Sequence, residues 1–203
     1  MQKTINGGTL RKMIVAGASL LEQNKKMVDA LNVFPVPDGD TGTNMFLTIK
    51  SASAEVNNCI NNNMDSLCEA YAKGALRGAR GNSGVITSQI LKGLTSVLSQ
   101  HQEVTTKVFA KAIQEGSNIA YKAVTKPKEG TILTVIRIMA EAALEAAKKH
   151  DDFEEFFEIV LTKGEEILQQ TPEMLPVLKK AGVVDAGGRG LIIIFTGYYK
   201  AIC

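Results

Sequence analysis

The chain has no tryptophan, only two histidines and only three cysteines in 203 residues. Cys59, Cys68 and Cys203 form no Cys-x-x-Cys pair and are odd in number, which argues against a disulfide framework or a structural zinc site. His101 and His150 lie in polar connections, so neither a Ser-His-Asp triad nor a multi-histidine metal site is expected. The chemistry therefore belongs to carboxylates, hydroxyls and backbone amides.

The sequence also lacks an excess of charge of one sign and has no long apolar run. The 23 basic and 21 acidic residues leave a formal net charge of +2, and aromatic residues make up 5% of the chain, so no nucleic-acid partner is expected. The N-terminus lacks the apolar run of a signal peptide, and the late apolar run 191–195 is far too short for an integral membrane segment. These features predict a cytoplasmic protein.

Apolar residues recur at steps of three and four along most of the chain, and no stretch alternates as a strand would. The spacing predicts an all-α domain of eight to nine helices. The predicted helices cover 9–23 with a further pattern at 27–31, then 43–56, 64–76, 83–98, 106–123, 131–148, 153–169 and 190–202. Thr43 and Thr131 are expected to cap helices, and Thr171-Pro172 to open a short one.

The segment 32–45, NVFPVPDGDTGTNM, sets two carboxylates one residue apart in a turn shaped by two prolines and two glycines. Asp38 and Asp40 can therefore face a common point, and carboxylates combined with substrate phosphates are the usual ligands of Mg²⁺. Because a helix is expected to begin at Thr43-Asn44, free amides for an anion would adjoin the acids. A plain surface turn is the alternative interpretation. An EF-hand is a poor match, since Ile49 stands where the bidentate Glu is required.

Three later segments also place glycines before a helix: 78–84 with Arg80 and a capping Asn82-Ser83 pair, 126–133, and 182–190 with Asp185. Loops of this kind can hold phosphate oxygens on backbone amides, although glycine loops between helices are more often structural. Ile132 and Leu133 could line an adenine or belong to the core. If all four helix starts lie at one end of a bundle, they form a single polar rim.

The four segments, in this order, resemble the nucleotide-binding domain of the dihydroxyacetone kinase L-subunit family, and more closely the N-terminal domain of bacterial fatty acid kinases. The resemblance implies an antiparallel barrel of about eight helices with ATP or ADP and Mg²⁺ at one end. It implies catalytic roles for Asp38, Asp40 and Arg80, with the two aspartates as metal ligands. The implied nucleotide-binding residues are Thr41, Thr43, Asn44, Gly81, Asn82, Ser83, Gly130, Thr131, Ile132, Asp185 and Gly187.

The fatty acid kinase resemblance implies transfer of a phosphoryl group from ATP to a fatty acid carboxylate. The fatty acid would be presented by a lipid-binding protein of the DegV family. Two alternatives remain open, a dihydroxyacetone (glycerone) kinase-type subunit and a non-catalytic nucleotide-binding scaffold. The L-subunit kinases carry a third aspartate where this chain has Val33, so Asn32 and Asp29 are the candidate replacements.

The last predicted helix is still in register at Cys203, without a polar tail. We therefore expect residues 1–203 to be a single ATP- and Mg-binding kinase domain at the start of a longer protein. A homodimer formed through regions beyond this chain is a further expectation.

Overall fold

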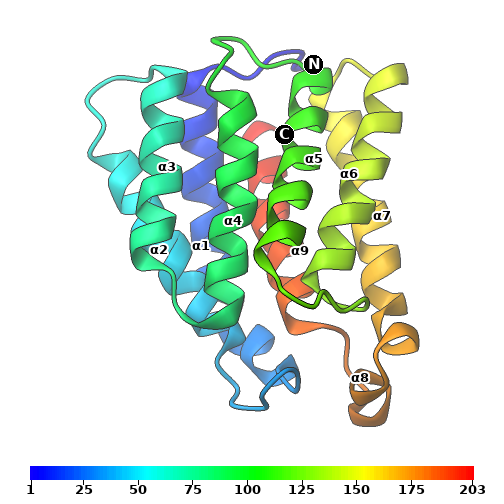
Figure 1. The fold of residues 1–203 in the computed structure, drawn as a ribbon. Helices are drawn as coiled ribbons and strands as arrows, with labels where there is room; N and C mark the ends of the chain where they lie inside the picture. Colours follow the sequence, from blue (N-terminus) through cyan, green and yellow to red (C-terminus); the bar gives the residue numbers. More distant parts are fainter.

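The computed structural model describes all 203 residues as a bundle of nine helices (Figure 1). The only β-type pairing is an isolated bridge between Ile5 and Val104. The helices are α1 (Gly7–Leu31), α2 (Thr41–Asn57), α3 (Met64–Gly78), α4 (Gly81–Leu98), α5 (Thr106–Ala123), α6 (Ile132–Lys149), α7 (Phe153–Met174), α8 (Pro176–Ala181) and α9 (Ala186–Ile202). The all-α prediction is confirmed. None of these helices is both long and apolar enough to cross a membrane.

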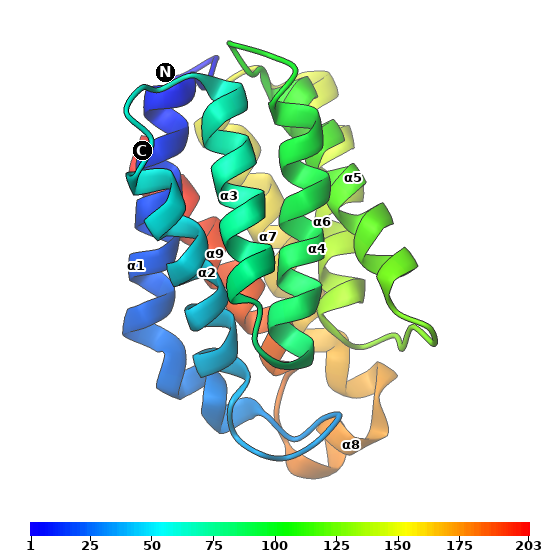
Figure 2. The same cartoon turned by 60° about the vertical axis from the view of Figure 1, so that its left-hand side comes forward.

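Helices α1 to α7 run alternately up and down, each packed against the next, and α9 packs against α1, α6 and α7 to close the bundle (Figures 1 and 2). Ile194 and Phe195 of α9 are buried in the core, and the Tyr198 hydroxyl lies 2.6 Å from that of Tyr71 on α3. The apolar run near the C-terminus is thus core.

Glycines let two helix pairs approach backbone to backbone. A methyl group on Gly197 of α9 would lie 2.5 Å from the Gly17 Cα of α1, and one on Gly93 of α4 would lie 2.6 Å from the Gly116 Cα of α5. Such separations leave no room for a side chain, so these positions set the spacing between the helices.

The helix boundaries differ from the predicted ones in two places. α1 is continuous from Gly7 to Leu31, so the patterns at 9–23 and 27–31 belong to one helix. α7 runs through Pro172 to Met174, and the expected short helix begins instead at Pro176. The reason is local: proline leaves the Leu168 carbonyl without its usual amide donor, and the Thr171 hydroxyl donates to that carbonyl at 2.7 Å.

Two predicted caps are wrong and one is confirmed. α2 begins after Asp40, and Thr43 lies inside its first turn. α4 begins after Arg80, so Asn82 and Ser83 also lie inside the first turn. The Thr131 side chain does cap α6, accepting from the Leu133 amide.

The starts of α2, α4, α6 and α9 all lie at the lower end of the bundle in Figure 1, beside α8. The chain termini lie toward the opposite end, where Gln2 accepts a backbone hydrogen bond from Phe153. The up-and-down order produces this segregation, because every second connection falls at the same end. The four glycine-containing segments therefore lie together at the lower end of the bundle.

Candidate nucleotide and metal site

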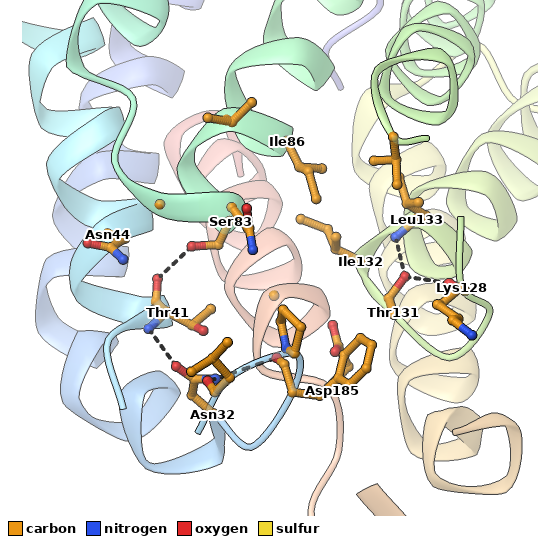
Figure 3. A pocket seen from close by; sticks show the side chains of 18 of the residues that line it. Asn32, Thr41, Asn44, Ser83, Ile86, Lys128, Thr131, Ile132, Leu133 and Asp185 are labelled. Carbon is orange, nitrogen blue, oxygen red and sulfur yellow. Dashed lines mark hydrogen bonds between the residues drawn. The ribbon is translucent and has the colours of Figure 1, made fainter. Parts of the chain in front are cut away.

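A cavity of about 600 Å³ opens at this end between the four helix starts and the C-terminal end of α5 (Figure 3). Its walls combine carboxylates, amides and apolar side chains. The residues that line it are Asn32, Phe34, Pro35, Val36, Asp38, Asp40, Thr41, Asn44, Gly81, Asn82, Ser83, Val85, Ile86, Ala123, Val124, Lys126, Lys128, Thr131, Ile132, Leu133, Asp185 and Gly187. The condition set by the sequence is therefore met: the four helix starts lie at one end of the bundle and share this cavity.

Asn32 organises the turn that carries the two aspartates. Its Oδ1 accepts from the backbone amides of Asp40 at 3.0 Å and Thr41 at 3.3 Å, and its Nδ2 donates to the Val36 carbonyl at 3.1 Å. The residue is buried, at 6% exposure. Its oxygen is therefore already shared by two amides and is poorly placed to act as the third metal ligand.

Asp29, the other candidate third ligand, is directed to a different task. Its carboxylate accepts from the Thr43 amide at 2.8 Å and from the Thr43 hydroxyl at 2.6 Å, so it caps α2 from the end of α1. Asp29 does not line the cavity. No three His, Cys, Asp or Glu side chains in the structure gather in a group suited to a metal ion. Three carboxylates line the cavity: Asp38 and Asp40, and Asp185, which caps α9.

Asp38 lies close enough to Asp40 to influence the ionisation of the Asp40 carboxyl. Burial, followed by the hydrogen bond and the like charge of Asp38, raises the pKa of Asp40, whereas the Asn44 side chain lowers it. Two adjacent carboxylates form a pair of hard oxygen donors, and a divalent cation would relieve their repulsion. The residues present therefore fit a hard divalent cation such as Mg²⁺, which Asp38 and Asp40 would hold.

The first turn of α4 is the helix start with free amides. At the start of α2, the Thr41 amide donates to Asn32 and the Thr43 amide donates to Asp29. At the starts of α6 and α9, the side chains of Thr131 and Asp185 accept from first-turn amides. The N-cap residue of α4, Arg80, makes no side-chain hydrogen bond to the helix. Unpaired amides at a helix start bind anions, so the first turn of α4 offers an anion site in the cavity that the two aspartates also line.

Gly81 brings that first turn close to α2. Its φ is +65°, and a methyl group at this position would lie 2.6 Å from Asn44 Nδ2. Glycine is therefore required both by the backbone conformation and by the lack of space. The Ser83 hydroxyl donates to the Thr41 carbonyl at 3.4 Å, a second link between α4 and α2 (Figure 3).

The opposite wall of the cavity is apolar. Ile86 of α4 and Ile132 of α6 both point into it, and Leu133 continues the wall (Figure 3). Ile132 and Leu133 are almost fully buried, whereas Val85 is 48% exposed at the mouth. An apolar wall next to unpaired helix-start amides can hold a ligand that has an apolar ring at one end and an anionic group at the other.

Asp185 lies in the cavity lining as a buried cap. Its Oδ2 accepts from the Gly188 amide at 2.8 Å, and its own amide donates to the Thr171 hydroxyl at 3.1 Å. Burial raises the pKa of Asp185 to about 6, against the lowering effect of hydrogen bonds from the Gly188 and Ile132 amides. The carboxylate thus ties the start of α9 to the start of α6.

Eleven of the predicted site residues line the cavity: Asp38, Asp40, Thr41, Asn44, Gly81, Asn82, Ser83, Thr131, Ile132, Asp185 and Gly187. Three do not. Arg80 is exposed outside the lining, and Thr43 is bound to Asp29. Gly130, at φ +88°, packs against Met174 and Leu175 of the α7 end.

The prediction also missed lining residues. Lys126 and Lys128 line the cavity, whereas the predicted nucleotide-binding residues of their segment, 126–133, are Gly130, Thr131 and Ile132. Val85 and Ile86 of α4 also line the cavity. No signal in the sequence marks them, because an apolar residue of α4 becomes part of a cavity wall only when α6 packs across from it.

Residues 35–200, most of the chain, match the family model described as the DAK2 domain, and the chain belongs to this family. Proteins from Staphylococcus aureus strains USA300, NCTC 8325 and COL, each described as an uncharacterized protein, are 48% identical over 202 residues. The match covers all of this chain but 37% of each of these relatives. The chain therefore spans little more than a third of the length of the curated relatives it matches.

The fold is similar to that of dihydroxyacetone kinase from C. freundii. The crystal structure of that enzyme with AMP-PNP and Mg²⁺ superposes with a TM-score of 0.69 at 15% identity, covering 94% of this chain and 33% of that one. Its native form gives a TM-score of 0.64 at 17% identity, covering 98% and 35%. At these identities the likeness establishes the fold.

Proposed function

We propose that this domain binds a Mg-nucleotide and transfers a phosphoryl group from ATP. The observation that carries the proposal is that Asp38 and Asp40, the free amides of α4 and the apolar Ile86–Ile132 wall surround one cavity. Membership of the DAK2 family and the fold shared with a kinase solved with AMP-PNP and Mg²⁺ support it.

The roles follow from the geometry. Asp38 and Asp40 would hold Mg²⁺, which when bound neutralises charge on the phosphate oxygens. The first-turn amides of α4, with Asn82 and Ser83, would hold the phosphates. Asn32 holds the backbone of the turn that carries the two aspartates. Arg80 is exposed, lies outside the cavity lining and directly precedes Gly81, which lines it, and it would add positive charge near the transferred group.

We further propose that the acceptor is a carboxylate, namely a fatty acid presented by a DegV-family lipid-binding protein, and that the product is an acyl phosphate. A carboxylate is ionised at neutral pH and needs no general base. No histidine lines the cavity, and the Asp185 carboxylate is occupied by backbone amides. An acceptor that needs no deprotonation suits this set of residues.

A hydroxyl acceptor such as dihydroxyacetone is the second candidate, favoured by the shared fold with dihydroxyacetone kinase. It requires removal of a proton, for which Asp38 and Asp40 are the remaining carboxylates in the cavity. Without a metal, the raised pKa of Asp40 would suit such a role. A carboxylate engaged with Mg²⁺ would be a weaker base.

The test is an ATP-consumption assay of the full-length protein, with a lipid-loaded DegV-family protein or with dihydroxyacetone as acceptor. Acyl phosphate trapped with hydroxylamine in the first mixture supports the carboxylate acceptor. ATP consumption with dihydroxyacetone alone supports the hydroxyl acceptor. Tight nucleotide binding without turnover in either mixture would instead indicate a nucleotide-binding scaffold.

A further inference from the structure

The loop between α5 and α6, residues 124–131, forms one wall of the cavity through Val124, Lys126, Lys128 and Thr131. Two of its side chains make hydrogen bonds. Thr131, which lines the cavity, donates to the Lys128 carbonyl at 2.8 Å and accepts from the Leu133 amide (Figure 3). Glu129 is not part of the cavity lining, and its side chain accepts hydrogen bonds from Tyr121 of α5 and Arg137 of α6.

Glu129 belongs to a closed ring of three hydrogen bonds. The Tyr121 hydroxyl of α5 donates to Glu129 Oε2 at 3.0 Å, and Arg137 Nε of α6 donates to the same hydroxyl at 3.1 Å. Arg137 Nη2 completes the ring by donating to Glu129 Oε1. The ring joins the last turn of α5, the loop and the second turn of α6.

The ring also sets the charge that the loop presents to the cavity. Arg137 pairs with Glu129, and the hydrogen bonds of Tyr121 and then Glu129 raise the pKa of Arg137, which keeps it charged. Lys126 and Lys128 form no ion pair in the structure. The acid of the loop is thus paired with Arg137, while its two lysines line the cavity without an ion pair of their own.

The exposure of the ring argues against a role in stability. The side chains of Arg137 and Glu129 are 39% and 49% exposed, and ion pairs this accessible contribute little to the folding free energy. Residues 124–128 have no other side-chain hydrogen bond that would hold them. The ring therefore acts on the position of this loop more than on the fold.

We propose that Glu129, Arg137 and Tyr121 are positioning residues that hold the α5–α6 loop, with Lys126 and Lys128, against a bound anionic nucleotide. The inference rests on the proposed nucleotide function and deepens it. None of the three ring side chains lines the cavity. Breaking the ring should therefore weaken nucleotide binding through loop disorder and leave the rate of the bound complex unchanged.

The experiment is titration calorimetry of the chain with Mg-AMP-PNP. Glu129→Ala and Arg137→Ala should each raise Kd by about tenfold, and the double variant should raise it no further, because both substitutions break the same ring. Arg137→Lys, which keeps the charge but loses the fork, should give an intermediate Kd. In the ATP assay of the full-length protein, KM should rise while kcat is unchanged.

The matched control is Glu145→Ala, which removes another exposed ion pair of α6, that with Lys148 at 2.8 Å. Its Kd should equal that of wild type. A Kd within twofold of wild type in both ring variants, additive losses in the double variant, or an equal loss in the control would overturn the positioning role while leaving nucleotide binding intact. If wild type itself binds no Mg-AMP-PNP, the nucleotide function fails, and the positioning role with it.

Discussion

Replacing Asp185 by Asn tests whether the buried negative charge of this carboxylate lowers the free energy of unfolding. The carboxylate is buried, at 5% exposure, and accepts from the Gly188 amide, yet burial raises its pKa to about 6 from an ordinary 3.8. At about 1.36 kcal/mol for each unit of pKa, this difference corresponds to about 3 kcal/mol.

The sign follows from the direction of the change. Because the folded-state pKa of Asp185 lies above the unfolded one, the folded protein holds this proton more tightly than the unfolded chain does. The cost of about 3 kcal/mol is therefore present above pH 6 and disappears as the pH falls from about 6 to below 3.8. Asp185 on its own makes the protein more stable toward acid.

The assay is urea unfolding of wild type and Asp185→Asn between pH 7.5 and pH 3.5. Loss of a hydrogen bond in the variant changes its stability by a constant amount, which cancels when the difference is compared across pH. On acidification, the difference between the two unfolding free energies should move by about 2 to 3 kcal/mol in favour of wild type.

The control for this measurement is Asp65→Asn, which removes an exposed carboxylate from the first turn of α3. A change in favour of wild type on acidification that is as large for this variant as for Asp185→Asn would show that loss of any carboxylate produces it. A difference between wild type and Asp185→Asn that does not vary with pH would refute the raised pKa and the inferred cost of the buried charge.

Three further predictions concern the metal, the anion site and the fold. Asp38→Ala or Asp40→Ala should abolish Mg-dependent nucleotide binding with helicity unchanged; calorimetry showing wild-type affinity in both variants would contradict the metal assignment. Gly81→Ala should weaken Mg-AMP-PNP binding by about tenfold, because its methyl group would lie 2.6 Å from Asn44 Nδ2; an unchanged Kd would show that the α4 turn does not hold phosphate. Arg11→Ala should lower the free energy of unfolding by about 2 kcal/mol, because its guanidinium donates to three carbonyls and to Asn62 Oδ1 around the α2–α3 connection; equal urea midpoints would contradict this.

Much of the site was predictable because its parts are local. The turn with Asp38 and Asp40 and the glycines of four helix starts are short-range features, and an up-and-down helical order brings alternate connections to one end. Their positions around one cavity agree with the prediction. Their roles as ligands stay predictions.

The sequence could not assign the polar side chains near the turn, because their partners are distant in the chain. Asp29 and Asn32 both looked available as a third metal ligand, but Asp29 binds Thr43, and Asn32 binds the amides of Asp40 and Thr41. Each contact spans eight or more residues and exists only after α1 and α2 pack together.

By itself, the sequence determined that the chain is all helical, with two carboxylates and four glycine-containing helix starts, since helical periodicity and turn chemistry act over a few residues. Tertiary structure decided which helix start keeps free amides, that Asp185 is a buried cap, and that Glu129 pairs with Arg137. These assignments depend on which donors and acceptors the packed helices bring together, so they become definite only in the folded bundle.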